Sequence, residues 1–373
     1  MALARNLPKI PTKLLSKPTV TIARRRYSTP IHGGHTFSTP DPKNIVNLVE
    51  VGPRDGLQNE KGAIIPVSLK VELINRLARA GHLNVEAGSF VSPKWVPQMA
   101  GTAEVLKGIE KQPGVHYAVL VPNQRGLDHL VELLDANPSN PPLTDEVSVF
   151  VAATDAFSRA NTNCTVAESL ERTAVVTRNA LDRGLRVRGY VSVVIRCPFS
   201  GEVDAKRVRE VTKELYDMGC YEVSLGDTVG LGRPHEVAAL LEEVKKGVPV
   251  EKLAGHFHDT SGTAIANIMT ALEHGVRTFD SSVGGLGGCP YSPGATGNVA
   301  TEDVLYALQG SKYHVAGLVD VPGRAKTVDL ERIVDIGWWI SEQLGRENIS
   351  RTGRMVKARR EREEERKRPK SKL

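Results

Sequence analysis

Eight short runs rich in β-branched residues alternate with longer stretches of helical periodicity through the middle of this 373-residue chain. Repeated strand–helix units form a parallel sheet, because each helix carries the chain back to the end at which the next strand must start. Eight units spaced by about 30 to 35 residues predict that the sheet closes into a (β/α)₈ barrel, the TIM barrel. The predicted strands are residues 44–52, 83–90, 116–122, 146–154, 185–194, 222–227, 252–258 and 278–284.

An open, doubly wound sheet is the alternative fold for such an alternation. Folds of that kind commonly bind dinucleotides through a G-x-G-x-x-G segment after the first strand, and no such segment follows residue 52. One further helix is predicted at residues 327–345, with Thr327 as its N-cap and an apolar stripe that would pack on the barrel. We therefore expect a barrel domain over residues 41–350 with an additional C-terminal helical segment.

The basic residues are concentrated at the two ends of the chain. Residues 1–40 contain seven basic and no acidic residues, and residues 351–373 have a net charge of +7. Because the whole chain has a net charge of +6, residues 41–350 carry −8, which argues against the remote alternative of a nucleic-acid-binding barrel. The chain also lacks any run approaching the roughly 20 apolar residues of a membrane span. Its four cysteines include no C-x-x-C pair, as expected in a reducing compartment.

Both ends of the chain have the features of targeting signals. Residues 1–40 are basic, rich in hydroxyl groups and free of acids, which predicts a mitochondrial transit peptide. Residues 351–373 are expected to form a charged flexible tail, and its last three residues, Ser-Lys-Leu, match the peroxisomal address. We therefore expect the mitochondrial matrix as location, peroxisomes as a second one, and organelle import receptors as partners.

Reactive side chains fall near the carboxyl ends of several predicted strands, where barrel enzymes place their active sites. Arg54 follows the first strand and offers a planar cationic fork suited to a carbonyl, an enolate or a carboxylate. Glu86 and Asp227 lie in the second and sixth strands, where a carboxylate could orient other groups or transfer a proton.

A metal site is predicted at the same end of the barrel. His256 and His258 are two residues apart in a strand, so both imidazoles point to one side and can bind the same ion as Asp55. A carboxylate with imidazoles suits Mg²⁺ or Mn²⁺, although these ligand types do not exclude Zn²⁺ or the iron site of a non-haem oxygenase.

The segment after the last strand, residues 284–298, contains six glycines around a single cysteine, Cys289. Such a loop is expected to be mobile, and its thiol could act as an acid or base when the loop closes over the barrel mouth. Asn298 and Glu302 are four residues apart and are predicted to face the metal together from the following helix. A simple helix cap is the alternative role for Asn298.

Five segments of the chain resemble the hydroxymethylglutaryl-CoA lyase family, over about residues 44–310. The segments are residues 49–60 (VEVGPRDGLQNE), 89–98 (SFVSPKWVPQ), 224–228 (SLGDT), 256–260 (HFHDT) and 285–291 (GLGGCPY). This resemblance implies that Cys289 is the catalytic thiol and that Arg54 and Gln58 bind substrate. The metal ligands that it implies are Asp55, His256, His258 and Asn298, with Glu86, Asp227 and Glu302 as supporting acids.

The resemblance implies a carbon–carbon lyase that cleaves 3-hydroxy-3-methylglutaryl-CoA to acetoacetate and acetyl-CoA, in ketone-body formation and leucine breakdown. The enzyme would be a homodimer that needs Mg²⁺ or Mn²⁺. A cation bound to the C3 hydroxyl and the carboxylate of the substrate would lower the pKa of that hydroxyl, and Asp55 or His256 would take its proton. Arg54 would stabilise the thioester enolate, and Cys289 would protonate the α-carbon.

The chain departs from the family pattern at several positions. Phe257 stands between the two histidines where Cys is usual, residues 87–88 are Ala-Gly where hydroxylated residues are common, and Arg196 replaces a small residue. These differences leave room for a lyase that acts on a related 3-hydroxyacyl-CoA. Claisen-type condensing enzymes, such as isopropylmalate or homocitrate synthase, share the Arg-Asp and His-x-His elements. They typically carry a Gly-Glu-Arg segment where residues 288–290 are Gly-Cys-Pro, so this loop favours the lyase.

Overall fold

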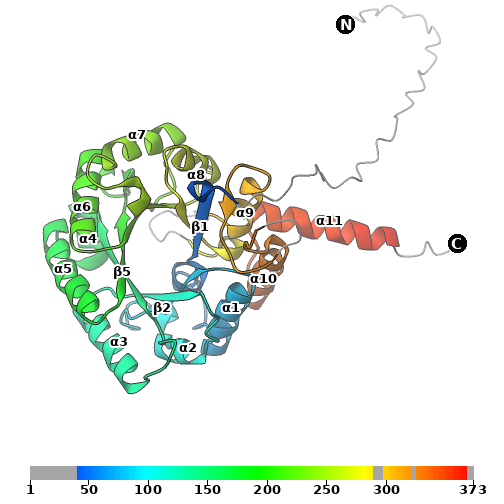
Figure 1. Ribbon diagram of the computed structural model, residues 1–373, viewed down its shortest axis with the longest axis horizontal. Coiled ribbons are helices and arrows are strands. Elements are labelled where there is room, and N and C mark those ends of the chain that lie inside the picture. Colours follow the sequence, from blue (N-terminus) through cyan, green and yellow to red (C-terminus); the bar gives the residue numbers. More distant parts are fainter. Residues whose placement is uncertain (1–39, 289–296, 321–324, 368–373) are drawn as a thin grey trace, which may run out of the picture. The chain divides into compact units, whose positions relative to one another are not determined.

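Eight parallel strands form a closed barrel in the computed structural model, which describes residues 40–288, 297–320 and 325–367 (Figure 1). The strands are β1 Ile45–Glu50, β2 Asn84–Ser89, β3 His116–Leu120, β4 Glu146–Ala152, β5 Arg186–Ser192, β8 Glu222–Asp227, β9 Leu253–Phe257 and β10 Thr278–Ser281. They pair in this order, and β10 pairs back with β1 to complete the ring. The predicted TIM barrel is therefore confirmed.

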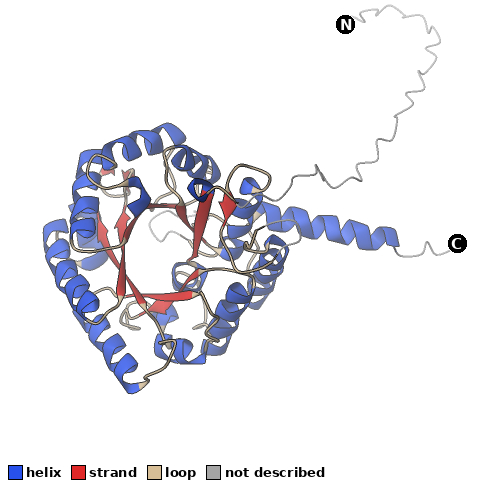
Figure 2. Cartoon of the chain, viewed as in Figure 1, coloured by secondary structure: helices blue, strands red, loops and turns tan. Residues whose placement is uncertain are grey.

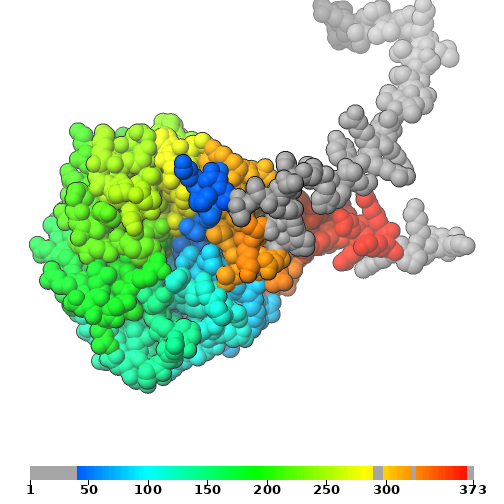
Figure 3. All heavy atoms as spheres, in the orientation of Figure 1, coloured from blue at the N-terminus to red at the C-terminus, as the bar shows by residue number. Residues whose placement is uncertain are grey.

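Helices surround the barrel on its outside (Figure 2). They are α1 Val67–Arg79, α2 Thr102–Gly108, α3 Gln124–Ala136, α4 Asp155–Thr162, α5 Val166–Asp182, α6 Ala205–Asp217, α7 Pro234–Val244, α8 Ala264–Glu273 and α9 Thr301–Leu308. Helix α5 begins at a capping box in which Thr165 and Glu168 each accept from the other's backbone N–H. Its apolar stripe, including Val176 and Ala180, is buried. Burial of apolar surface stabilises the fold by about 25 cal/mol per Å². On the face seen in Figure 3, atoms fill most of the ring that the ribbons leave open.

Several strands end two or three residues earlier than predicted. Strand β4 ends at Ala152, β5 at Ser192 and β10 at Ser281, because the ladder hydrogen bonds stop there and the chain turns into the loops of the barrel mouth. The shorter elements were not predicted. They are η1 Pro42–Asn44, the π-helix η2 Gly52–Gly56, η3 Pro97–Met99, η4 Val250–Lys252, η5 Val283–Gly285, the hairpin strands β6 Arg196–Cys197 and β7 Gly201–Glu202, and β11 His314–Val315 beside β1.

The predicted helix after the barrel is present as α10 Leu330–Gln343, but its cap differs from the prediction. Asp329 caps α10 by accepting from the backbone N–H groups of Glu331 and Arg332. Thr327 instead donates its hydroxyl to the carbonyl of Val315, 2.8 Å away. The prediction of Thr327 as N-cap is wrong, because this side chain is used in a tertiary contact.

The prediction of a flexible tail from residue 351 is also wrong for the described part, because α11 Arg351–Lys367 is a helix (Figure 1). Tertiary contacts hold the part of this helix from Gly353 to Arg360. Arg360 forms ion pairs with Glu331 and Asp335 of α10, and Trp338 donates its ring N–H to the carbonyl of Gly353 at 3.0 Å. The composition alone gave no sign of these partners.

Some predicted features lie outside the described residues. They are the transit peptide (residues 1–39 of the predicted 1–40), the thiol of Cys289 and the C-terminal Ser-Lys-Leu. Within the described part, no helix is both long and apolar enough to cross a bilayer.

Candidate metal centre

The π-helical turn η2 directly after β1 presents Arg54 and Asp55 at the mouth of the barrel. Arg54 is 6% exposed and donates to Glu86 of β2 through Nε at 2.8 Å, while Nη1 donates to Asp55 at 2.8 Å. Ser148 of β4 donates to the second oxygen of Glu86 at 2.7 Å. Burial acts to lower the pKa of Arg54, but the negative charges of Glu86 and Asp55 raise it above its ordinary value. The guanidinium therefore remains charged.

Asp55, His256 and His258 form the one group of three candidate metal ligands found among the described His, Cys, Asp and Glu side chains. One ligand atom from each lies within 4.8 Å of the others. Nε2 of His256 is 3.2 Å from Nε2 of His258 and 3.9 Å from Oδ2 of Asp55. Asn298 donates its amide N–H to Oδ2 of the same carboxylate at 2.8 Å, so its side chain borders the group.

These residues fit a divalent cation. Two imidazole nitrogens and a carboxylate oxygen at such distances repel one another unless a proton or a cation lies among them. Burial opposes ionisation of Asp55, but Arg54 and the two histidines outweigh it and hold the pKa of Asp55 below its ordinary value. Burial, followed by the neighbouring His256, lowers the pKa of His258 to about 4, so this imidazole is neutral and can bind a metal at neutral pH.

The structure adds Asp280 of β10, which the sequence analysis missed. Its Oδ2 accepts from His256 Nδ1 at 2.9 Å and from Ser224 Oγ at 2.8 Å, and its Oδ1 lies 2.9 Å from Arg188 Nη2. Burial acts to lower the pKa of His256, but Asp280 raises it above its ordinary value. The sequence signal was present: Asp280 and Arg188 are charged residues inside predicted strands, where a charge is buried and needs a charged or hydrogen-bonding partner.

Asp227 is not part of the ligand group. It ends β8, is fully buried, and accepts from the backbone N–H groups of Gly230 and Gly232 at 3.2 and 2.8 Å. Burial raises the pKa of this carboxyl above its ordinary value, ahead of the lowering effect of these hydrogen bonds. Its contacts are those of a residue that shapes the loop after β8.

The prediction that Asn298 and Glu302 lie on one helix is wrong, because α9 begins only at Thr301. Asn298 lies before α9 and forms an isolated bridge with His258. Both oxygens of the buried Glu302 accept from the N–H of Gly284 at 3.0 Å, so this acid supports the glycine-rich segment. Gln58 donates to Oδ1 of Asp55 at 2.7 Å.

The glycines at the base of the loop allow two chain segments to approach closely. Gly287 has φ +131°, and a Cβ there would lie 2.8 Å from the amide nitrogen of Asn298. Gly297 has φ +79°, and its Cβ would lie 2.7 Å from the N of Gly288. Because both conditions exclude larger residues, the glycines at these two positions reflect close packing at the base of the loop.

Residues 346–352, which we name the C-terminal clasp, hold this glycine-rich segment and the chain that follows β9. Arg346 forms an ion pair with Glu60 and donates to the carbonyl of Gly285. Arg351 donates to Asp259, directly after His258, at 2.8 Å. The backbone N–H groups of Arg351 and Thr352 and the hydroxyl of Ser350 donate to the carboxylate of Asp303. Nothing in the sequence predicted this clasp.

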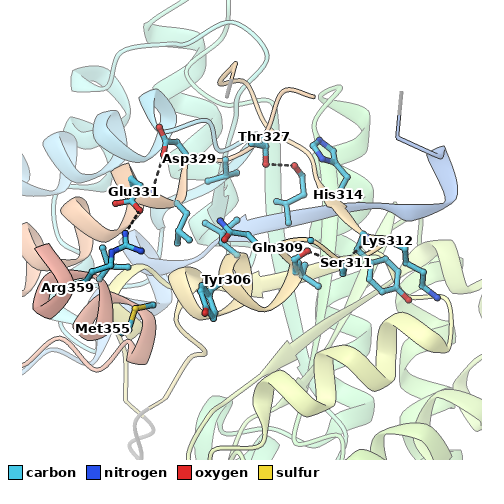
Figure 4. Close-up of a pocket in the computed structure, with 18 residues that line it drawn as sticks. Tyr306, Gln309, Ser311, Lys312, His314, Thr327, Asp329, Glu331, Met355 and Arg359 are labelled. Carbon is cyan, nitrogen blue, oxygen red and sulfur yellow. Dashed lines mark hydrogen bonds and ion pairs between the residues drawn. The ribbon is translucent and has the colours of Figure 1, made fainter. Parts of the chain in front are cut away.

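A cavity of about 460 Å³ lies elsewhere, between α9, α10 and α11 (Figure 4). Tyr306, Met355 and Arg359 line one side of it, and His314 and Asp329 lie on the opposite side. None of its lining residues belongs to the candidate metal ligands. This cavity therefore does not coincide with the candidate metal site.

Comparison with known proteins agrees with this geometry. Residues 45–340 match the HMGL-like family. The chain is 52% identical to hydroxymethylglutaryl-CoA lyase of Pseudomonas mevalonii over 85% of this chain and 99% of that protein. It is 49% identical to the mitochondrial hydroxymethylglutaryl-CoA lyase of Bos taurus, over 83% and 89% of the two chains. A crystal structure of hydroxymethylglutaryl-CoA lyase from Pseudomonas aeruginosa superimposes with a TM-score of 0.77 at 50% identity, over 85% of this chain and 98% of that one. The chain therefore belongs to the HMGL-like family.

Proposed function

We propose that the protein is a divalent-metal-dependent lyase that cleaves 3-hydroxy-3-methylglutaryl-CoA to acetoacetate and acetyl-CoA. The observation that carries this proposal is the convergence of Asp55, His256 and His258 beside the buried cation Arg54. Similarity to lyases of this name over nearly their whole length supports the same reaction.

Asp55, His256, His258 and the amide oxygen of Asn298 would hold the cation. When bound, a divalent cation lowers the pKa of a coordinated hydroxyl and orients it. Mg²⁺ and Mn²⁺ are the proposed ions, because both accept carboxylate, amide and water oxygens. Gln58 keeps the Asp55 carboxylate in place through the hydrogen bond to Oδ1.

The protein's own side chains account for the proton and charge movements. Asp55 or His256 would accept the proton of the substrate's C3 hydroxyl, and the C2–C3 bond then breaks as the C3 carbonyl forms. The electron pair moves into the thioester enolate, whose charge Arg54 would stabilise. Glu86 fixes the guanidinium for this task through two short contacts. We assign the proton delivered to the α-carbon to Cys289, which follows Gly288 at the base of the loop.

The test is an assay of metal-stripped protein for acetyl-CoA release from 3-hydroxy-3-methylglutaryl-CoA, with Mg²⁺ and Mn²⁺ restored separately. Release with either ion, and none without, is expected. A parallel assay with 3-hydroxyacyl-CoA substrates carrying a longer C3 substituent addresses the alternative acyl group. Absence of release from every substrate with both ions would contradict the proposal.

For location we propose the mitochondrial matrix, with peroxisomes as a second site and import receptors as partners. The acid-free basic N-terminus and the C-terminal Ser-Lys-Leu support this proposal, as does the existence of a mitochondrial relative. Separate fluorescent fusions at the two ends test it, and labelling of neither organelle would contradict it. We also propose a homodimer that acts on an acyl-CoA, and light scattering on the purified protein checks its mass.

A further inference from the structure

We name the candidate ligands Asp55, His256 and His258 the metal group. A continuous row of buried polar side chains extends from it through the barrel toward the amino-terminal ends of the strands. We name His256, Asp280, Arg188 and Glu222 the interior ion chain. Arg188 and Asp280 are 1% and 2% exposed. Arg188 donates from Nε to Glu222 at 2.8 Å and from Nη1 to the Tyr190 hydroxyl at 2.7 Å. Glu222 lines a cavity of about 260 Å³ at the end of the barrel opposite to the metal group.

Such a chain is not explained by stability alone. Taking charges out of water is costly, and well-packed apolar residues are commonly as stable as a buried ion pair. Four of the groups around Asp280 and Arg188 have their hydrogen-bonding atoms aimed at these two residues: Ser224, Tyr190, Glu222 and His256. The arrangement therefore specifies one orientation of the Asp280 carboxylate, and that carboxylate contacts the metal histidine.

The contact determines which nitrogen of His256 carries the proton. A carboxylate accepts hydrogen bonds, so the proton of a neutral His256 must be on Nδ1, 2.9 Å from Asp280. The lone pair is then on Nε2, which faces His258 Nε2 at 3.2 Å and Asp55 Oδ2 at 3.9 Å. Without the carboxylate, the proton could sit on Nε2 and point into the metal group.

We infer that Asp280 is a positioning residue that fixes the tautomer and ring orientation of His256 for metal binding, and that Arg188 and Ser224 hold Asp280 in turn. This inference rests on the proposed function, since it takes the Asp55–His256–His258 group as the metal site. Neighbours that orient a metal-binding histidine commonly contribute about 10- to 100-fold to metal affinity.

The experiment compares the wild type with Asp280→Asn by titration with Mn²⁺ alone, followed by electron paramagnetic resonance of the free ion. The variant is expected to bind Mn²⁺ about 10- to 100-fold more weakly. The matched control is Asp145→Asn, which alters another His–carboxylate pair, His116 Nδ1 to Asp145 Oδ2 at 2.7 Å, without touching the metal group. This control is expected to bind Mn²⁺ as the wild type does. Equal affinity in Asp280→Asn and wild type would overturn the inference.

A second measurement does not depend on metal or on turnover. Nitrogen NMR of the metal-free protein with labelled histidine distinguishes the two tautomers, at a pH high enough to keep imidazole neutral. The His256 signal is assigned by its loss in His256→Gln. We expect Nδ1–H in the wild type and a substantial Nε2–H population in Asp280→Asn, and an unchanged tautomer would overturn the inference. If the wild type binds no Mn²⁺, the proposed function fails, yet the tautomer measurement still decides this point.

A further variant covers the case in which Asp280→Asn does not fold because Arg188 has lost a partner. Arg188→Met/Glu222→Gln/Asp280→Asn removes all three charges, so neither an uncompensated guanidinium nor an unpaired Glu222 carboxylate is left in the barrel. The same loss of Mn²⁺ affinity and the same tautomer change are expected in this triple variant. Wild-type affinity with an Nδ1–H tautomer in a folded triple variant would overturn the inference.

Discussion

The two sides of the barrel mouth are built in different ways. On the metal side, strands β1, β9 and β10 carry Asp55 (just after β1), His256 and Asp280, and buried charges orient them. On the other side, the glycine-rich segment after β10 is held by the C-terminal clasp, residues 346–352, which follows α10. The first side is therefore fixed once the barrel closes, whereas the second also requires the chain beyond the barrel to pack.

This difference separates two properties that a variant can lose. Damage on the metal side should weaken ion binding and turnover together, because the same side chains serve both. Damage to the contacts that Arg346 of the clasp makes with Glu60 and Gly285 should leave the ion in place and slow turnover, because the segment that leads to Cys289 loses its support. The predictions below test this separation.

The largest effect is expected from Asp55→Ala. A bound divalent cation stabilises charge in the transition state by several kcal/mol, and each 1.4 kcal/mol is a factor of ten, so kcat should fall by roughly a thousandfold or more. Mn²⁺ binding should be lost with it. Steady-state kinetics and Mn²⁺ titration measure both, and Asp303→Ala, which removes a carboxylate of the clasp side, serves as the control that retains Mn²⁺ binding. Normal Mn²⁺ affinity in Asp55→Ala would remove this residue from the metal site.

Arg54→Met/Glu86→Gln should give the next largest loss. Removing the guanidinium alone would leave a buried carboxylate unpaired, so both charges are replaced. Loss of one group that stabilises a developing oxyanion lowers kcat on the order of 10² to 10³-fold. Mn²⁺ affinity should change far less, as a titration would establish. A rise in KM with unchanged kcat would mean that Arg54 binds the substrate without stabilising the enolate.

The sequence was sufficient for the parts of the site that follow from strand geometry. Alternation along β9 placed His256 and His258 on one side and Phe257 on the other, and Phe257 does pack on Phe279, with ring centroids 6.5 Å apart. Asp280 was not predicted because it lies within β10, whereas barrel enzymes are expected to carry their reactive groups at the carboxyl ends of the strands.

Features that depend on distant partners could not be predicted. Helix α11 has few apolar residues, so its sequence pattern does not predict where it packs. Its position depends on partners distant in sequence, such as Asp303 and Glu331. Asn298 and Glu302 were placed on one helix because four-residue spacing is helical. The bridge between Asn298 and His258, a long-range contact, delays the start of α9 instead.

The interior ion chain should also appear in acid unfolding. Burial alone would raise the pKa of Asp280, but Arg188 and the hydrogen bond from His256 lower it from 3.8 to about 2. A carboxyl whose pKa is lower in the folded state stabilises the fold above its unfolded pKa, and this contribution is lost as the pH falls from about 4 to about 2. A shift of this size corresponds to about 2 kcal/mol. Urea unfolding at several pH values should show that the free energy of unfolding decreases less between about pH 4 and pH 2 in Asp280→Asn than in wild type. An equal decrease in both proteins would contradict the assignment.

The smallest effect is expected from Arg346→Ala in the clasp. A charge-assisted hydrogen bond contributes about 1.5 kcal/mol or more, so loss of the contact with Glu60 and Gly285 should reduce kcat by roughly tenfold. Mn²⁺ affinity should stay at the wild-type value, because no metal-side residue contacts Arg346 in the described structure. The matched control is Arg360→Ala, which breaks exposed ion pairs between α11 and α10 and should leave kcat unchanged. If Arg346→Ala weakened Mn²⁺ binding as much as turnover, the two sides of the mouth would form one cooperative unit, and the clasp would have to be regarded as part of the metal site.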